Sequence, residues 1–499
     1  MKKFKYTLLF ALSLSVFFVT ISCKKEAIED PNTEIENNDA DDNVISLEGD
    51  LQISDFIWQG LNLYYYWQKD VPALADTKIS DKKAYAKYIS ENPDPDEFFE
   101  SLLHADDRFS WIQDDYRELE NTLQGIFATN GVEFTLLYAC QNCDELVGVV
   151  KYILKGSNAE GKAIKRGDLF TGVNGTTLTI NNYRELLFGE NLSYTLNLAS
   201  FQNGALVSNG VNVELTKIEN FETDPIQVNA VLETNAGKVG YLMYNQFVLD
   251  KSPLLNQVFA DFKNSGITEL ILDLRYNGGG SIQNCIELAS MITGQFTGKV
   301  FAKQVWNSKL NEYFIDKYGE ESLIDRFVDK LSEGSTINSL QLNRLYVLTT
   351  NESASASELL INGLTPYIDI VQIGEKTVGK NVGSITVYDY VNNSSTKNPN
   401  HNYAMQPIVL KVANSDGFAD YANGLTPNKE IDEDLRNLGV LGDQSEAFIA
   451  AAINLISGTG KYVHPKAIMP RTLLVRDPLL LKRQRMIMDK DLSLNELMK

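Results

Sequence analysis

The fold is decided by an apolar run that ends in three glycines, LILDLRYNGGG at residues 270–280. The run predicts a buried strand and a tight turn, and apolar residues at helical spacing over 282–292 predict a helix directly after it. A Gly-rich turn of this kind leaves backbone N–H groups that can bind an anion or a developing oxyanion. It lacks the Gly-Lys-Ser/Thr ending of a phosphate loop and the G-x-G-x-x-G spacing of a dinucleotide site. By itself, the run leaves the chemistry open.

Strands and helices alternate on both sides of this run. Further strands are expected at 238–244, 345–349, 370–373 and 408–412, and further helices at 251–264 and 357–364. Alternation of this kind is typical of an α/β domain, which we assign to residues 218–455.

The second informative run is TTNESASASELL at residues 349–360, where an expected strand ends, small residues follow and an amphipathic helix begins. Ser and Ala are common at helix N-termini for capping and packing alone. The alternative is a nucleophile held at a helix N-terminus, where the helix dipole favours negative charge. This run alone favours the simple cap.

A third element, Val378-Gly379-Lys380, changes that balance. The Asp-Leu-Arg-x-Asn-x-Gly-Gly turn from Asp273, the Ser-Ala-Ser-Glu run from Ser355 and the later Gly-Lys pair together resemble the C-terminal processing (tail-specific) peptidases, family S41. The resemblance implies a catalytic domain of the ClpP/crotonase-like α/β type. It also implies that Ser355 is the nucleophile and that Lys380, 25 residues later, is its base.

The same resemblance places the oxyanion hole at the backbone N–H groups of Ala356 and Gly279, with Gly278 or Gly280 as alternatives to Gly279. A serine hydroxyl attacks only after a base takes its proton, and a lysine serves as that base only when it is neutral. Glu358 lies one helical turn after the nucleophile. It orients the Ser-Lys dyad by hydrogen bonding or is an ordinary first-turn acid, and the sequence leaves both roles open.

A histidine base is the alternative to a lysine. The chain has three histidines, His104, His401 and His464. Some members of the family place a catalytic His in an Asp-x-His-Ser/Thr motif of the N-terminal domain, but the corresponding residue here is Phe109. A Ser-Lys dyad is therefore expected.

The N-terminus has the composition of a secretory signal. Lysines at positions 2, 3 and 5 precede an apolar stretch and small residues before Cys23. Because Cys23 stands as in a bacterial lipobox, we expect a lipoprotein signal peptide over 1–23 and a lipid on Cys23. Ten acidic residues against two lysines over 24–50 predict an acidic flexible tether at 24–45. The chain is thus expected in the cell envelope as an outer-membrane lipoprotein, on the periplasmic or the surface side.

A helical domain and a terminal segment complete the outline. Residues 46–120 are expected to form a helical N-terminal domain whose aromatic run, DFIWQGLNLYYYW at 55–67, fills its core. The partly basic segment at 456–499 is expected to be an appended C-terminal tail or a lid helix.

Residues 121–217 resemble a PDZ domain. The resemblance rests on a GSNA turn at 156–159, a Gly-Asp ending at 167–168, a VNG turn at 173–175 and an expected groove-lining helix at 182–187. PDZ domains bind a peptide C-terminus as an added strand at a sheet edge. The fold class expected for the whole chain is therefore multidomain α+β: helical, PDZ-like and α/β catalytic parts.

Composition excludes two classes of protein. Acidic residues outnumber basic ones by 66 to 45, a formal charge of −21, and such a chain repels the phosphate backbone of nucleic acids. Four cysteines are too few for a disulfide scaffold in 499 residues.

Cys140 and Cys143 have no second pair with which to bind zinc, so a local disulfide across a turn is expected. Cys285 is expected to be a buried, small apolar residue.

Together, these features predict a lipid-anchored serine endopeptidase that cuts protein or peptide substrates near their free C-termini. Acylation of the serine is followed by hydrolysis of the acyl-enzyme, with no metal ion, organic cofactor or nucleic-acid partner. One alternative is a catalytically silent lipoprotein that uses the PDZ-like groove to hold peptides. A second is a glycan-binding surface lipoprotein, suggested by the acidic tether and the aromatic residues at 64–67.

Overall fold

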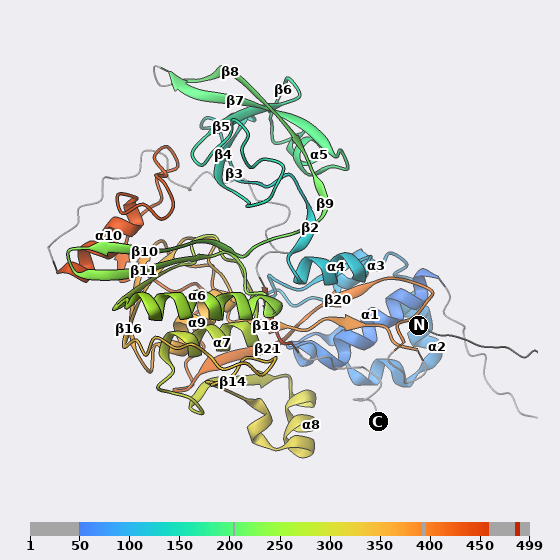
Figure 1. Cartoon of the computed structure of the whole chain (residues 1–499). Coiled ribbons are helices and arrows are strands. Elements are labelled where there is room, and N and C mark those ends of the chain that lie inside the picture. The colour runs from blue at the N-terminus through green and yellow to red at the C-terminus, as the bar shows by residue number, and fades with distance from the viewer. Residues whose placement is uncertain (1–48, 203–204, 392–395, 459–484, 490–499) are drawn as a thin grey trace, which may run out of the picture. The chain divides into compact units, whose positions relative to one another are not determined.

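The computed structural model describes residues 49–202, 205–391, 396–458 and 485–489 (Figure 1). The expected signal peptide at 1–23, its lipidated Cys23 and the acidic tether at 24–45 lie outside the described residues. Among the described helices, none is both long and apolar enough to cross a membrane. Helices and several sheets share the described chain, so the expected α/β, multidomain class is confirmed.

Residues 50–123 are mostly helical, and three of the four α-helices begin at an aspartate cap. The elements are α1 (Asp50–Tyr64), η1 (Gln68–Asp70), η2 (Pro72–Leu74), η3 (Asp76–Ser80), α2 (Lys82–Ser90), α3 (Pro95–Ser101) and α4 (Tyr116–Leu123). The side chains of Asp81, Asp94 and Asp115 accept backbone N–H bonds at the starts of α2, α3 and α4. Trp58 and Tyr64 of α1 are at most 1% exposed, so the expected aromatic core is confirmed.

An antiparallel sheet follows, which we call the β-domain (residues 132–216). Its strand order is β3-β4-β5-β7-β8. The elements are β3 (Val132–Tyr138), β4 (Leu146–Ile153), β5 (Leu169–Val173), β6 (Thr176–Thr177), α5 (Tyr183–Phe188), β7 (Ser193–Gln202) and β8 (Ala205–Thr216). They enclose a hydrophobic core of their own. The antiparallel pair β2 (Ile126–Thr129) and β9 (Ile218–Glu222) connects the β-domain to the rest of the chain, and Cys140 and Cys143 form the expected disulfide.

The central sheet has the order β10-β11-β12-β16-β17-β22. Its strands are β10 (Ile226–Thr234), β11 (Gly237–Tyr244), β12 (Glu269–Asp273), β16 (Arg344–Thr349), β17 (Asp369–Gly374) and β22 (Lys429–Glu430). β10 is antiparallel to β11, and all other neighbours run parallel. The carboxyl ends of β11, β12, β16 and β17 therefore meet at one edge, which is where open α/β sheets bind their ligands.

Helices cover both faces of this sheet. The helices α6 (Ser252–Ser265), α7 (Ile282–Thr293) and α9 (Ala356–Leu364) share one core, whereas α10 (Ala447–Ser457) belongs to another. β11 shows why: Leu242 points into the first core, and Tyr241 and Met243 point into the second. Strands buried on both faces read as continuous apolar runs, and for that reason the sequence predicts them well.

A second sheet, β13-β23-β18-β21-β14-β15, contacts α7 and α9. Its strands are β13 (Gly279–Ser281), β14 (Val300–Trp306), β15 (Ile324–Arg326), β18 (Val382–Ser384), β21 (Ile408–Asn414) and β23 (Arg485–Ile487). The helices η4 (Leu249–Lys251), α8 (Ser308–Tyr318) and η5 (Glu320–Leu323), and the small sheet of β1 (Trp111–Gln113), β20 (Ala404–Gln406) and β19 (Val387–Tyr388), complete the described elements.

The expectation of an appended tail or a lid helix is wrong for the described end of the chain. Residues 485–487 form β23, a strand inside the second sheet. The apolar residues there are Met486, Ile487 and Met488, a run too short to be recognised as a strand within a basic segment. Residues 459–484 and 490–499 lie outside the described part of the chain.

Candidate active site

Ser355 stands at the turn between β16 and α9, at the carboxyl edge of the central sheet. Its backbone adopts φ 65° and ψ −113°, in a region that residues with a side chain rarely enter. Strain of this kind persists only where the surroundings impose it, and it is frequent at active sites. The side chain is placed at the N-terminus of α9, where the helix dipole favours a developing negative charge.

Three serines occupy this turn, and only one of their hydroxyls donates no hydrogen bond. The Ser353 hydroxyl donates to the carbonyl of Leu274 (2.8 Å), and the Ser357 hydroxyl donates to the carbonyl of Asn277 (3.0 Å). The Oγ of Ser355 is fully buried, and its hydroxyl donates to no acceptor among the described residues. Ser353 and Ser357 thus tie the turn to the segment after β12, whereas the hydroxyl of Ser355 is left for chemistry.

The carboxylate of Glu358 joins the two halves of the predicted dyad. Its Oε2 accepts the backbone N–H groups of Ser355 (2.7 Å) and Lys380 (2.8 Å). Its Oε1 accepts the backbone N–H of Gly379 (2.7 Å) and the hydroxyl of Thr377 (2.5 Å). Burial raises the pKa of Glu358, and these four hydrogen bonds act in the opposite direction. Of the two roles that the sequence left open, the contacts favour an orienting one.

Lys380 is 2% exposed and lies against the N-terminal helical region. Its Nζ is 5.0 Å from the centre of the Phe109 ring, the residue that stands where a histidine base was considered. The neighbouring Arg108 guanidinium donates to the carbonyl oxygens of Gly379 (2.9 Å) and Ala422 (3.0 Å). The helical region therefore covers Lys380 with an aromatic ring and holds the loop of this lysine through an arginine.

The described histidines have other partners. His401 lies 3.0 Å from the carboxylate of Asp389, and the ring of His104 stacks on Trp67. His464 lies outside the described residues. The contacts of His104 and His401 therefore give no support to a histidine base.

The expected oxyanion turn follows β12, and its N–H groups differ in availability. The N–H of Gly279 donates to the side-chain oxygen of Asn277 (2.8 Å), whose amide group donates to the carbonyl of Tyr244 (2.8 Å). The N–H of Gly278 makes no hydrogen bond with a described residue. In this state the alternative donor, Gly278, is the available one, and Gly279 becomes available only if Asn277 releases it. Ala356 is the first residue of α9, whose N–H has no partner within a helix.

The oxyanion turn and the nucleophile turn are bonded to each other. The carbonyl of Asn277 accepts the backbone N–H of Ala354 (3.1 Å) as well as the Ser357 hydroxyl. Cys285 of α7 is fully buried beneath them, with its Sγ 3.3 Å from the carbonyl of Ala356, and burial raises the pKa of its thiol. Cys285 is thus the buried apolar residue that was expected.

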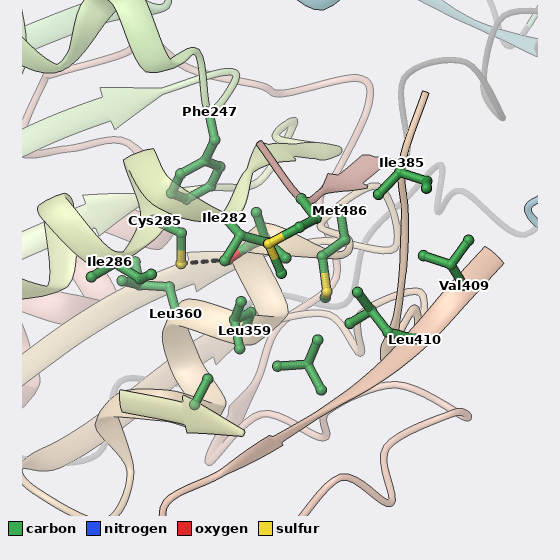
Figure 2. Packing of buried hydrophobic residues seen from close by; sticks show 14 of the residues in the cluster. Phe247, Ile282, Cys285, Ile286, Leu359, Leu360, Ile385, Val409, Leu410 and Met486 are labelled. Atoms are coloured by element: carbon green, nitrogen blue, oxygen red, sulfur yellow. Dashed lines mark hydrogen bonds between the residues drawn. The ribbon is translucent and has the colours of Figure 1, made fainter. Parts of the chain in front are cut away.

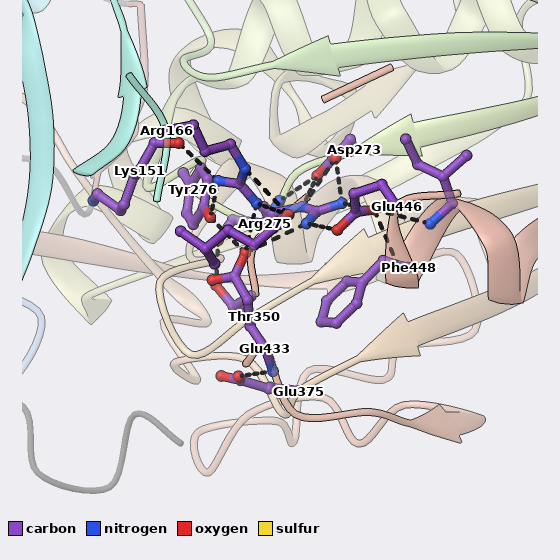
Figure 3. A network of polar contacts seen from close by, with 12 residues as sticks. Lys151, Arg166, Asp273, Arg275, Tyr276, Thr350, Glu375, Glu433, Glu446 and Phe448 are labelled. Atoms are coloured by element: carbon purple, nitrogen blue, oxygen red, sulfur yellow. Dashed lines mark hydrogen bonds and ion pairs between the residues drawn. The ribbon is translucent and has the colours of Figure 1, made fainter. Parts of the chain in front are cut away.

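A buried ionic network supports the turn from below (Figure 3). Arg275 is fully buried and pairs with Asp273 (2.9 Å), Glu446 (2.8 Å) and Glu433 (3.3 Å). Its backbone carbonyl accepts the hydroxyl of Thr350, which lies in the nucleophile turn. Arg275 therefore contacts the nucleophile turn through its backbone, while three carboxylates compensate the charge of its buried guanidinium.

The β-domain reaches this network with two basic side chains. Arg166 donates to the Tyr276 hydroxyl (2.7 Å) and pairs with Glu433 (3.2 Å). Lys151 of β4 pairs with Glu352 of the nucleophile turn (2.8 Å). The Arg166 contacts lie beside the oxyanion turn (Figure 3), and the Lys151 pair touches the nucleophile turn.

A cavity of about 670 Å³ opens onto the oxyanion turn. Its walls come from Gly278 and Tyr276, from the N-terminal helical region, from the β2–β9 connection, from Lys217 and from the β-domain, including Phe188. The side-chain oxygen and nitrogen of Asn245, directly after β11, line it without a hydrogen-bond partner among the described residues. A peptide group would satisfy both atoms of this amide.

Two residues of this region carry no sequence motif. Asn245 could have been found by topology, because it follows a parallel strand that ends at the same edge as the glycine turn. Tyr421 has a buried hydroxyl without a hydrogen-bond partner, and burial and the nearby Glu358 charge raise its pKa far above the usual range. Nothing in its sequence neighbourhood indicates a place beside the dyad.

Comparison with known proteins agrees with this geometry. Residues 238–406 match the model of peptidase family S41, and residues 52–111 match that of the peptidase S41 N-terminal domain. A Staphylococcus aureus (strain COL) protein named "Probable CtpA-like serine protease" is 26% identical over 283 residues, 56% of this chain and 49% of the relative. A Staphylococcus epidermidis protein of the same name is 22% identical over 384 residues, 76% of this chain and 64% of the relative.

The chain spans about half the length of the first of these curated relatives. Among solved structures, a crystal structure of a candidate S41 protease from Bacteroides fragilis is similar over 81% of this chain and 98% of its own, with 25% identity and a TM-score of 0.63. The likeness extends beyond the matched catalytic region to most of the described chain.

Proposed function

We propose that the chain is a serine endopeptidase of peptidase family S41, the family whose models match residues 238–406 and 52–111, and that Ser355 is the nucleophile and Lys380 the general base. One observation carries the assignment. Of the three serine hydroxyls in the turn, only that of Ser355 donates to no described acceptor, and its backbone shares one carboxylate oxygen with the backbone of Lys380.

The proposed reaction needs only groups of the chain and water. Lys380 takes the proton of the Ser355 hydroxyl as Oγ attacks the substrate carbonyl, and the N–H groups of Ala356 and Gly278 stabilise the oxyanion. Collapse of the tetrahedral intermediate releases the amine, which takes the proton from Lys380. Water then attacks the acyl-enzyme, with Lys380 again as base. Burial of an amine favours its neutral, proton-accepting form, and the 2% exposure of Lys380 fits that requirement.

Glu358 acts as a positioning residue in this proposal. It touches neither substrate nor a reacting atom, because its two oxygens are used by backbone and threonine donors of the two catalytic segments. By holding the backbone of Ser355 and of Lys380 on one oxygen, it fixes the approach of hydroxyl and amine before substrate arrives.

We further propose that the β-domain captures substrate C-termini in the manner of a PDZ domain. β3 is an edge strand of its sheet, and such an edge can accept a peptide as an added strand. The cavity runs from Phe188 of the β-domain and the adjoining Lys217 to Gly278, so a captured chain can reach the oxyanion turn. A lipid on Cys23 and a place in the cell envelope remain part of the proposal, and metabolic labelling with a fatty acid, compared between wild type and Cys23→Ser, tests them.

The decisive experiment is proteolysis of an unstructured protein by the purified chain from Ile45 onward. Wild type is compared with Ser355→Ala and Lys380→Ala, and Ser357→Ala is the matched control because its hydroxyl only ties two turns together. Cleavage by wild type and Ser357→Ala, and by neither dyad variant, is expected. Cleavage that survives Ser355→Ala would show that another nucleophile acts. Peptide binding without cleavage in every form would favour the silent peptide-binding lipoprotein.

A further inference from the structure

The described C-terminal segment of the chain lies beside the candidate active site. β23 stands between β13 and β18 in the second sheet and runs parallel to both. β13 begins at Gly279, in the oxyanion turn, and β18 begins at Val382, two residues after Lys380. The segment therefore separates the main chain of the oxyanion turn from the main chain that carries the base.

Backbone pairing fixes this segment on both sides. Met486 lies opposite Gly280, and Ile487 lies opposite both Ser281 of β13 and Ser384 of β18. The N–H of Met488 then donates to the carbonyl of Ser384 (3.0 Å). A strand inserted in this way uses the hydrogen-bonding edges of both neighbours, as a bound peptide does when it joins a sheet.

The side chains of the segment fit their surroundings. Met486 is fully buried against Ile282, Leu410 and other apolar residues of the core, and Met488 is 6% exposed (Figure 2). The carboxylate of Asp489 accepts the hydroxyl of Ser281 (2.6 Å) and the backbone N–H of Gln283 (3.1 Å). These donors stand at the start of α7, where the helix dipole favours an anion.

We propose that residues 485–489 are an internal ligand of the strand site for substrate, and that they keep the enzyme latent until an extended peptide displaces them. This inference rests on the proposed peptidase function. A peptide bond that Ser355 attacks must lie between the oxyanion donors and the base, and β13 and β18 flank that position. The segment also indicates the ligand class, which is an extended peptide with apolar side chains followed by a carboxylate.

Two observations fit a segment that can leave its place. The Oγ of Ser355 is fully buried, so the site must open before a substrate reaches this atom. Both neighbours keep other partners without it, because β18 also pairs with β21 and Gly280 of β13 forms a bridge with Phe247. Release of a three-residue strand is therefore a local opening, which requires far less free energy than global unfolding.

The first test compares cleavage of a short, unstructured fluorogenic peptide by full-length and altered chains. A chain that ends at Gln484 is expected to show about tenfold higher kcat/KM than wild type, because the rate scales with the fraction of molecules whose site is open. Full-length Met486→Ala is expected to change in the same direction by a smaller factor. The matched control is Leu310→Ala in α8, which removes another buried side chain and lowers Tm without raising activity.

The second test adds the segment back as a separate molecule. A synthetic peptide of sequence RMIMD is expected to inhibit the chain that ends at Gln484 competitively, with weaker inhibition when asparagine replaces the aspartate. A scrambled peptide of the same composition is the control. Binding of labelled RMIMD to a Ser355→Ala chain that ends at Gln484, measured by fluorescence anisotropy, needs no catalysis, so it separates failure of this inference from failure of the proposed activity.

The opposite outcome is equally clear. If the shortened chain and Met486→Ala both lose activity in step with Tm, and RMIMD neither inhibits nor binds, β23 is a structural strand and the inference is wrong. If the shortened chain does not fold, the direction of change in full-length Met486→Ala decides alone.

Discussion

The catalytic core and the β-domain are held in place by different means. In the core, segments distant in sequence meet on buried hydrogen bonds, as where Ser355 and Lys380 share the carboxylate of Glu358. The β-domain has its own hydrophobic core, and it meets the catalytic part through a two-stranded connection, basic side chains such as Lys151 and Arg166, and an apolar cluster that contains Leu137 and Leu435. The hydrogen bonds of the core organise the chemistry before substrate arrives, whereas ion pairs and side-chain packing join the β-domain to the core.

The largest effect on stability is expected from Arg275→Met in the core. The change leaves the carboxylates of Asp273, Glu433 and Glu446 buried without their shared cation, all at most 3% exposed. Loss of one partner from a buried ion pair lowers the free energy of unfolding by about 3–5 kcal/mol. Urea unfolding measures this loss.

The control for that prediction is Arg344→Met. Arg344 pairs with Asp369 on the surface, where the two side chains are 49% and 56% exposed. Surface pairs of this kind contribute at most about 1 kcal/mol. Equal losses in the two variants would contradict the view that the buried network braces the site.

Glu358→Gln is expected to lower kcat by about 10²- to 10³-fold, the range seen when one positioned donor or acceptor of a catalytic site is lost. Both carboxylate oxygens accept two donors, and an amide group cannot accept on its nitrogen side. Either the Ser355 and Lys380 pair or the Gly379 and Thr377 pair loses its acceptor. A peptide cleavage assay measures kcat, and a change confined to KM would contradict the positioning role.

The same variant tests the sign of a pH effect. Burial raises the pKa of Glu358 above its usual value of 4.5. The folded state then holds a proton that the unfolded state has lost, so the contribution of this group to stability is complete below about pH 4.5 and falls as pH rises through the raised pKa. Wild type should therefore lose stability relative to Glu358→Gln across that window. The urea unfolding midpoints of wild type and Glu358→Gln are measured at several pH values. A constant difference between the two proteins would contradict a raised pKa.

A smaller effect, on substrate use, is expected from Arg166→Ala at the contact between the β-domain and the core. The change removes the bonds to the Tyr276 hydroxyl and to Glu433, but it leaves Ser355, Lys380 and Glu358 untouched. We expect kcat/KM for a long unstructured protein to fall by about tenfold, which corresponds to about 1.4 kcal/mol, with less change for a short peptide. The adjacent, exposed Lys165→Ala is the matched control. Equal losses of kcat/KM on the long protein and the short peptide would show that the change acts on the catalytic step instead.

The sequence allowed the core strands and the three motifs to be recognised, because strands buried on both faces form long apolar runs. The partners of Glu358 could not be predicted in the same way. Thr377 and Gly379 are 19 and 21 positions away, and they reach its carboxylate only because β17 pairs with β16 in parallel. β13, β18 and β23 have three residues each, which is too short for a period to be detected.

The sequence also could not predict which N–H groups of the oxyanion turn are available. The glycines at 278–280 are equivalent as a pattern, and only the position of the Asn277 side chain shows that the N–H of Gly279 is engaged while that of Gly278 is available. Likewise, the sequence shows that Phe109 replaces a histidine, but its place against Lys380 follows from the packing of the helical region.

The smallest effect is expected from opening the disulfide of the β-domain by Cys140→Ser with Cys143→Ser. The bridge joins two cysteines with a sequence separation of 3. They follow the end of β3 that lies away from the connection to the core. A loop that short restricts the unfolded chain little, so the loss of stability should not exceed about 2 kcal/mol. The kcat for a short peptide should stay unchanged, because no bond of the catalytic core passes through these cysteines. A fall in kcat for the short peptide in this double variant would show that the β-domain and the dyad are coupled more tightly than their few contacts indicate.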